Sequence, residues 1–221
     1  RYIHAQNIPL IMFEYDKKSL SSEETDVFVV GLGCFWGVES KFGSIDGVVR
    51  TSCGYSGGTE ENPTYENIKD HTETVRVEYD SSKVSYKELV NVAISTHNLK
   101  TPNRKRQYDN VIFYNTDKQK ETVEQTVEEN GYSIDEVETR IEKRGSYYYA
   151  EDYHQKYRLR SRRSLEQQFT DKYTETQFRD SALATKINSL VAGDLSREEF
   201  SIPSEFEMTD DIFDRIIGRF R

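Results

Sequence analysis

The feature that most constrains the fold is a short β-branched run that stops abruptly at two glycines and a cysteine. Asp26–Val30 is apolar and β-branched, which predicts a buried strand. Gly31–Gly33 interrupts the run, and the apolar residues of Cys34–Phe42 then recur at helical spacing. A strand followed at once by an amphipathic helix predicts a layered fold in which helices pack on a sheet. The cysteine falls at the first turn of that helix.

The chain continues as an alternation of strands and helices. Further strands are expected over Gly47–Tyr55, Thr74–Tyr79, Val111–Tyr114 and, more weakly, Val137–Glu142. Ser85 and Glu88 have capping-box spacing and predict a helix that runs to Thr96. Another helix is expected over Asp117–Asn130. The order β-α-β-β-α-β predicts an α+β protein, specifically a two-layer α/β plait with a ferredoxin-like, split βαβ core.

Composition changes twice along the chain and suggests three segments. We expect 1–24 to be an N-terminal arm or leader and 25–158 to be the main domain. Residues 159–221 are expected to be a helical C-terminal extension that packs on the core. Within the extension, helices are expected over Phe178–Val191 and, as a terminal amphipathic helix, over Ile212–Phe220.

Composition also excludes several classes of protein. The 221 residues are 31% charged with a net charge of −9, so nucleic acid is not expected as the main partner. Two cysteines rule out a disulfide framework and a four-cysteine zinc site. His71 and Glu73 lack a third ligand, so no metal is expected. No apolar run reaches the length of about 18 residues that crosses a membrane. We expect a monomer without a bound cofactor, and the cytoplasm as the default location.

Cys34 is the first candidate for chemistry. Backbone N–H groups at a helix N-terminus carry partial positive charge, which favours a thiolate and is expected to lower the thiol pKa. The alternative is a buried structural cysteine, because free cysteine is among the most buried residue types. Position alone does not separate the two.

Six short motifs follow one another over Val27–Arg158. They are Gly33-Cys34-Phe35-Trp36-Gly37, Gly54-Tyr55-Ser56-Gly57-Gly58, Asn62-Pro63-Thr64-Tyr65, His71-Thr72-Glu73, Gln107-Tyr108, and Tyr149-Ala150-Glu151 with His154-Gln155. In this order they resemble the motifs of the A-type peptide methionine sulfoxide reductases. That family reduces methionine S-sulfoxide, free or in proteins, and the resemblance makes 25–158 the catalytic domain.

The resemblance implies a role for four residues in the reaction. Cys34 would attack the sulfoxide sulfur, and Glu73 would protonate the oxygen. Tyr65 and Tyr108 would donate hydrogen bonds to that oxygen as charge develops on it. The products would be methionine and a sulfenic acid on Cys34.

Other residues are expected to hold the substrate. The resemblance implies that Phe35 and Trp36 form an apolar pocket for the S-methyl group. It also suggests that one or two of the tyrosines at 147–149 line the cleft, of which we select Tyr149. Asn103 stands where the family usually has an acidic residue and is expected to keep its hydrogen bonding. His154 would be a candidate base for Cys34, but the resemblance puts it in a structural segment.

Two departures from the family pattern concern loop length and recycling. Only Glu66–Thr72 separates Tyr65 from Glu73, which resembles a shorter-loop branch, and no cysteine of this chain follows Cys53. The sulfenic acid would therefore be reduced by Cys53 or by an external thiol, either a small thiol or a thioredoxin-like protein. We favour the interpretation that Cys53 is a small buried strand residue.

Two rival functions use the same residues. A cysteine hydrolase or acyltransferase would pair Cys34 with His154 or His71. A non-catalytic protein that binds Met-containing segments would keep only the aromatic pocket.

Overall fold

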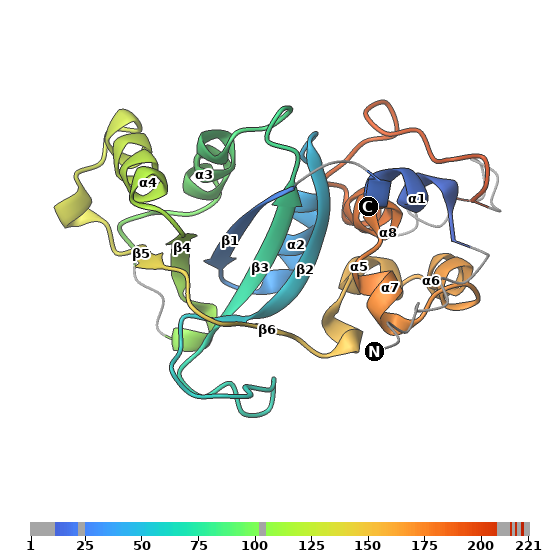
Figure 1. The fold of residues 1–221 in the computed structure, drawn as a ribbon, viewed down its shortest axis with the longest axis horizontal. Coiled ribbons are helices and arrows are strands. Elements are labelled where there is room, and N and C mark those ends of the chain that lie inside the picture. Colours follow the sequence, from blue (N-terminus) through green and yellow to red (C-terminus); the bar gives the residue numbers. More distant parts are fainter. Residues whose placement is uncertain are drawn as a thin grey trace, which may run out of the picture.

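A mixed β-sheet forms the centre of the structure (Figure 1). The computed structural model describes residues 12–21, 25–101 and 105–206, together with positions 213, 215 and 218. The strands are β1 (Asp26–Leu32), β2 (Val48–Ser56), β3 (Thr72–Tyr79), β4 (Asn110–Tyr114), β5 (Arg140–Lys143) and β6 (Tyr147–Tyr149). Their order in the six-stranded sheet is β5-β4-β1-β3-β2-β6. Neighbouring strands are antiparallel except β4 and β5, which are parallel.

The four central strands have the order of the expected split βαβ plan. β3 lies between β1 and β2 and is antiparallel to both, and β4 pairs with the other edge of β1. The whole sheet, however, is not a four-stranded plait, because β5 and β6 extend it at both edges and it curls (Figure 1). The extension at β6 depends on Gly54, where a Cβ would lie 2.4 Å from the Tyr147 ring. Three consecutive tyrosines show no alternation, so β6 was not expected.

Three helices cover one face of the sheet. They are α2 (Phe35–Gly43), α3 (Tyr86–Ser95) and α4 (Asp117–Glu129). Phe28 of β1, Phe42 of α2 and Leu89 of α3 are fully buried in one apolar cluster that is the main core. The expected capping box is present, with the Ser85 side chain and Glu88 each accepting a hydrogen bond from the other residue's backbone N–H.

The C-terminal region is helical and has its own apolar cluster. Its helices are α5 (Tyr157–Arg160), α6 (Arg163–Thr170), α7 (Glu175–Arg179) and α8 (Ala182–Ala192). The single helix expected over Phe178–Val191 is divided into α7 and α8, because the Ser181 side chain accepts from the Ala184 N–H and caps α8. The helix expected over Ile212–Phe220 lies outside the described residues, except for 213, 215 and 218.

The segment before β1 packs against these C-terminal helices. It forms helix α1 (Glu14–Ser21), and Phe13 belongs to the second apolar cluster. The buried Asp16 carboxylate accepts hydrogen bonds from the Tyr173 hydroxyl at 2.6 Å and the Leu183 backbone N–H at 2.9 Å. These contacts join two ends of the chain that are far apart in sequence.

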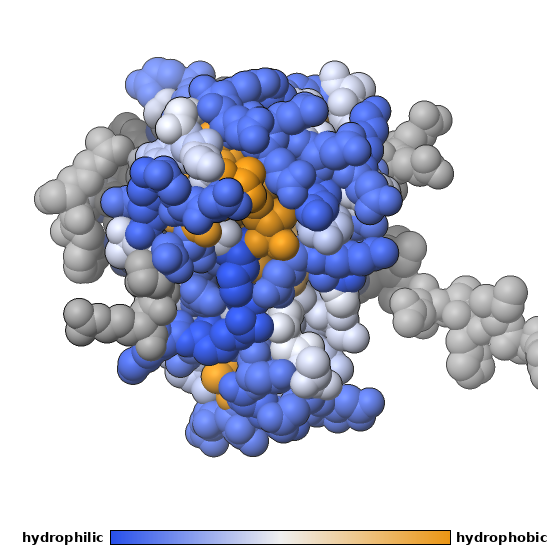
Figure 2. All heavy atoms as spheres, turned by 90° about the vertical axis from the view of Figure 1, so that its left-hand side faces the viewer, coloured by the Kyte–Doolittle hydropathy of each residue, from blue (hydrophilic) through white to orange (hydrophobic). Residues whose placement is uncertain are grey.

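Hydrophilic residues cover most of the face drawn in Figure 2, as the charged composition leads one to expect. Figure 2 shows the face that carries α4 and β5, on which an apolar strip is surrounded by hydrophilic residues. Among the described residues, every helix is too short or too polar to cross a membrane.

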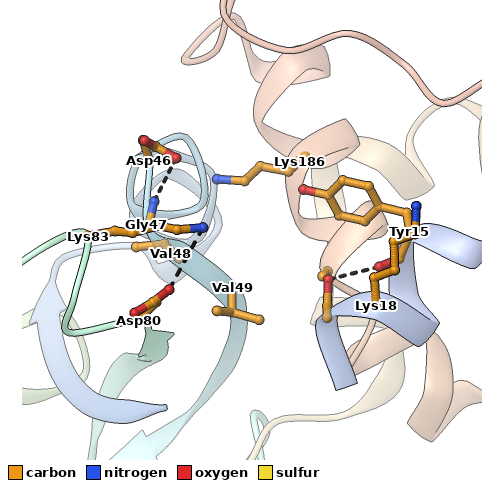
Figure 3. Close-up of a pocket in the computed structure, with 11 residues that line it drawn as sticks. Tyr15, Lys18, Asp46, Gly47, Val48, Val49, Asp80, Lys83 and Lys186 are labelled. Atoms are coloured by element: carbon orange, nitrogen blue, oxygen red, sulfur yellow. Dashed lines mark hydrogen bonds and ion pairs between the residues drawn. The ribbon is translucent and has the colours of Figure 1, made fainter. Parts of the chain in front are cut away.

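Lys186 connects α8 to the far end of α2. Its ammonium group donates to the carbonyl oxygens of Gly43 and Ile45, each at 2.9 Å, and so caps the C-terminus of α2. The side chain lies beside a cavity of about 290 Å³ between α1, α8 and two turns (Figure 3). Burial lowers the pKa of Lys186 to about 8, and Asp46 only partly opposes that effect.

This lowered pKa predicts a pH dependence of stability. Between about pH 8 and 10.5 the unfolded chain binds more protons at Lys186 than the folded chain does, so the free energy of unfolding rises with pH. We expect Lys186→Met to remove up to about 3 kcal/mol of that rise. Urea denaturation of the wild type and of Lys186→Met across this pH range measures the difference between their free energies of unfolding. The other titrating groups are the same in both proteins, so their contributions cancel. Parallel pH profiles would contradict the assignment.

Candidate active site

Cys34 is the N-cap residue of α2. Its backbone is extended, with φ −63° and ψ 119°, and the residue reaches the surface. Gly33 precedes it at φ +82°, a left-handed conformation that turns the chain from β1 into α2. The Cys34 side chain makes no capping hydrogen bond, but the backbone N–H groups of Trp36 and Gly37 are close enough to lower the pKa of the thiol. The strand, turn and helix thus present the thiol at a helix N-terminus, as expected.

The pKa of Cys34 differs from the expectation. Burial raises the pKa of the thiol, and the negative charge of Glu73 raises it further. The N–H of Trp36 and the charge of Arg158 lower it, but they do not compensate for burial. The expectation of a lowered pKa was wrong because it counted the helix N-terminus and not the desolvation around the sulfur.

Glu73 is a buried carboxyl beside the first turn of α2. It lies on β3 and is 1% exposed. The Phe35 backbone N–H donates to one oxygen at 3.2 Å, and the Gln107 side-chain amide donates to the other at 2.7 Å. Burial raises the pKa of Glu73, and the two hydrogen bonds offset only part of that shift. A carboxyl with a raised pKa keeps its proton to higher pH than an ordinary carboxyl and is therefore better suited to act as an acid.

Two tyrosines meet beside these groups. Tyr65 comes from the loop before β3, and Tyr108 ends the 3₁₀ turn Arg106–Tyr108. The side chains of Tyr65 and Tyr108 are hydrogen bonded, which raises the pKa of Tyr108 to about 12, with burial and the charge of Glu73 adding to the effect. Cys34 also raises this pKa, so its sulfur is near the Tyr108 hydroxyl. Tyr108 therefore stays a neutral hydrogen-bond donor.

Glu151 fixes the position of Tyr65. One carboxylate oxygen accepts from the Tyr65 backbone N–H at 2.8 Å, and the other accepts from the Tyr55 hydroxyl at 2.7 Å. Burial alone would raise the pKa of Glu151, but these hydrogen bonds outweigh it and lower the pKa. We did not assign a role to Glu151 from the sequence, although its motif contained the signal.

An aromatic wall completes the site. Phe35 is buried, and its ring centre is 4.9 Å from that of His154. The Trp36 indole N–H donates to His154 Nδ1 at 3.1 Å, while its ring stacks on Tyr157 at 3.6 Å. Burial lowers the pKa of His154, so the ring is neutral and engaged with Trp36. This role in orienting Trp36 leaves little support for His154 as the base of a hydrolase.

Comparison with known proteins identifies the family. The family model described as "Peptide methionine sulfoxide reductase" matches residues 26–187. The chain belongs to the peptide methionine sulfoxide reductase family. It is an oxidoreductase that reduces peptide-methionine (S)-S-oxide.

Individual relatives agree with this assignment. A peptide methionine sulfoxide reductase of Drosophila melanogaster is 38% identical over 181 residues, covering 79% of this chain and 72% of the relative. An MsrA of Methanothermobacter thermautotrophicus is 44% identical over 139 residues, covering 58% and 82%. Among solved structures, methionine sulfoxide reductase A of Corynebacterium diphtheriae has a TM-score of 0.53 at 32% identity, covering 62% of this chain and 75% of that one.

Tyr149, which we expected at the substrate site, lies apart from these groups. Tyr149 is 45% exposed and lies under the Arg179 guanidinium, 3.8 Å from its ring centre. Tyr148, not Tyr149, is the register partner of the buried Tyr55, so Tyr149 points to the opposite side of the sheet. We expected Tyr149 to line the substrate cleft. Successive side chains of a strand point to opposite faces of the sheet, so the three tyrosines cannot all face the same side. Asn103 lies outside the described residues.

Cys53 is fully buried in β2. Its sulfur is 3.9 Å from the Phe35 carbonyl oxygen, and its backbone N–H and C=O both bond to the Gln155 side chain. Burial raises the pKa of Cys53 well above its ordinary value, and the charge of Glu39 adds to the shift. Both effects disfavour a reactive thiolate.

His71 holds the loop that precedes β3. Its Nδ1 accepts from the Gly58 backbone N–H at 3.2 Å, and its Nε2 is 2.7 Å from the Glu60 carbonyl oxygen. Within the described part of the chain, His, Cys, Asp and Glu side chains form no group of three that would hold a metal ion.

The hydrogen bond from Gln107 predicts how the acidity of Glu73 is controlled. Because the amide stabilises the ionised carboxylate, Gln107→Met should raise the pKa of Glu73 further. A ¹³C NMR titration of the Glu73 carboxyl measures the shift. The matched control is Gln119→Met on α4, where the amide oxygen bonds the Asn115 N–H. A Glu73 pKa that is equal in the two variants would contradict the role of Gln107.

Proposed function

We propose that Cys34 is the nucleophile of the reductase and that Glu73 is its general acid. The observation that carries the proposal is the convergence of a thiol, a protonatable carboxyl and two phenols at one helix N-terminus. The Cys34 sulfur attacks the sulfoxide sulfur, and the sulfoxide oxygen ends on Cys34. The substrate sulfur is reduced to the thioether of methionine, and the thiol is oxidised to a sulfenic acid.

Proton supply decides whether the oxygen can leave the substrate. Glu73 gives its proton to the oxygen as negative charge builds there, and its raised pKa enlarges the fraction of the enzyme that carries this proton. The carboxylate that remains then accepts the proton of the Cys34 thiol. Tyr65 and Tyr108 donate hydrogen bonds that strengthen with the same charge. The rate should therefore fall as pH rises through the pKa of Glu73. In Gln107→Met this fall should occur at a higher pH.

The aromatic wall accounts for substrate choice. Phe35 and Trp36 provide an apolar surface for the S-methyl group, and Trp36 is held by His154 and Tyr157. With the methyl group on that wall and the oxygen on the tyrosines, the two isomers send the rest of the methionine in different directions, and only one of these leaves the sulfur open to attack by Cys34. This arrangement is what selects the S isomer in free or protein-bound methionine.

Recycling requires a thiol from outside the described residues. The sulfur of Cys53 is enclosed behind Phe35 and its pKa is raised, so an attack on Cys34 would require opening the core. The sulfenic acid is instead reduced by an external thiol, either a small thiol or a thioredoxin-like protein. Two thiols enter, and a disulfide and one water leave, which restores the Cys34 thiol.

The activity is tested with both diastereomers of an N-acetylated methionine sulfoxide and dithiothreitol. We expect the S isomer to be converted to methionine and the R isomer to persist. Cys34→Ser should lower the rate by at least about a thousandfold, because it removes the nucleophile. Chiral chromatography measures both isomers. Consumption of the S isomer at the wild-type rate by Cys34→Ser would refute the role of Cys34.

The role of Cys53 is tested by trapping the enzyme after one turnover without reductant. We expect intact mass to show one added oxygen, the mark of a sulfenic acid, because Cys53 is enclosed. Cys53→Ala should then be reduced by dithiothreitol as fast as the wild type. A loss of two hydrogens in the wild type, absent in Cys53→Ala, would instead identify an internal disulfide.

A further inference from the structure

A groove of about 200 Å³ opens on one side of Cys34. It runs along α2 toward the end of α3. It is lined by Leu32, Cys34, Gly37, Val38, Lys41, Phe42 and Thr96. Glu73, Tyr65 and Tyr108 do not line it. Of the residues assigned to the reaction, therefore, only Cys34 borders both the groove and the place where the oxygen is held.

The walls of the groove suit an apolar arm. Leu32, Val38 and Phe42 contribute carbon surface, and Phe42 is fully buried beneath it. At Gly37 a Cβ would meet no atom within 4 Å, and the backbone there is not in the left-handed region. Glycine in a helix costs about 0.5–1 kcal/mol relative to alanine, and no contact within the described fold requires it here. The bare backbone leaves room for something outside the chain.

The chemistry of recycling requires such an entrance. The incoming thiolate forms an S–S bond with Cys34 while the S–O bond breaks, and the hydroxyl takes a proton and leaves as water. In displacement at a two-coordinate sulfur, the entering and leaving atoms lie roughly in line. The oxygen leaves on the side of Glu73 and the tyrosines, so the thiol must enter from a different side. The groove is an opening at Cys34 that those residues do not line.

We propose that this groove is the entry channel for the thiol that reduces the Cys34 sulfenic acid. The inference rests on the proposed function and adds the route by which the reductant arrives. The occupant is a thiol on a short apolar arm, carried by a small molecule or by a protein. The exposed ammonium group of Lys41 at the rim, together with the charge of Arg158 near Cys34, also favours thiolate over thiol at the entrance.

The test fills the groove from its far rim. Thr96 is exposed, follows α3 and lines the groove, whereas its neighbour Ser95 is also exposed and does not line it. Thr96→Trp is therefore the blocking variant and Ser95→Trp the matched control. Each is first given methionine S-sulfoxide without reductant, and the methionine formed per enzyme is measured. The sulfenic acid is then reduced with dithiothreitol or with thioredoxin, and intact mass follows the loss of oxygen.

We expect Thr96→Trp to form one methionine per enzyme at the wild-type rate and to be re-reduced about tenfold more slowly. Ser95→Trp should match the wild type in both steps. Slowing with both reductants supports a channel for any thiol, and slowing with one alone identifies that reductant as the occupant. Unchanged re-reduction would overturn the proposal. So would a loss of the first step in Thr96→Trp, because the groove would then belong to the substrate. Absence of methionine formation in the wild type would refute the proposed function instead.

Discussion

The buried ion pair between Glu39 and Lys156 is the interaction on which the site depends. Both side chains are fully buried, and the ammonium group lies 2.8 Å from one carboxylate oxygen. Lys156 also donates to the Thr51 and Arg179 carbonyl oxygens, and its own N–H donates to Glu39. A buried pair repays its desolvation only when such additional hydrogen bonds exist, and removing one partner costs about 3–5 kcal/mol. The pair thus joins α2 to β2, to α7 and to the segment that carries Glu151 and His154.

Helix α2, which begins after Cys34, is held at three points along its length. Glu73 accepts from the N–H of Phe35 at the start, Glu39 holds the middle, and Lys186 caps the end. A helix of nine residues would be marginal alone, since isolated helices shorter than about 12 residues are unstable in water. Here the fixed positions orient the N–H groups that face Cys34 before substrate arrives. Donors that are already oriented need no reorganisation during the reaction.

Sequence reasoning predicted the features that local pattern determines. The strand orders around β1, the capping box at Ser85 and the motifs around Cys34 and Glu73 are local or ordered signals, and the family assignment followed from them. It did not predict β6, the direction of Tyr149 or the raised pKa of Cys34. Each of these depends on tertiary surroundings: a glycine that admits a tyrosine ring, a pairing register, and the burial around a sulfur. Propensity carries no information about such surroundings.

The raised pKa values of Cys34 and Glu73 have a common consequence. The Glu73 charge raises the pKa of the thiol, so the state in which both groups are ionised is disfavoured. A protonated thiol is a poor target for oxidants, since the thiolate is the reactive form. In the proposed reaction Glu73 gives its proton to the bound sulfoxide oxygen, and the carboxylate that remains accepts the proton of the Cys34 thiol as its sulfur attacks. On this proposed mechanism proton transfer and sulfur attack are coupled, and the thiol loses its proton only where the substrate is already present.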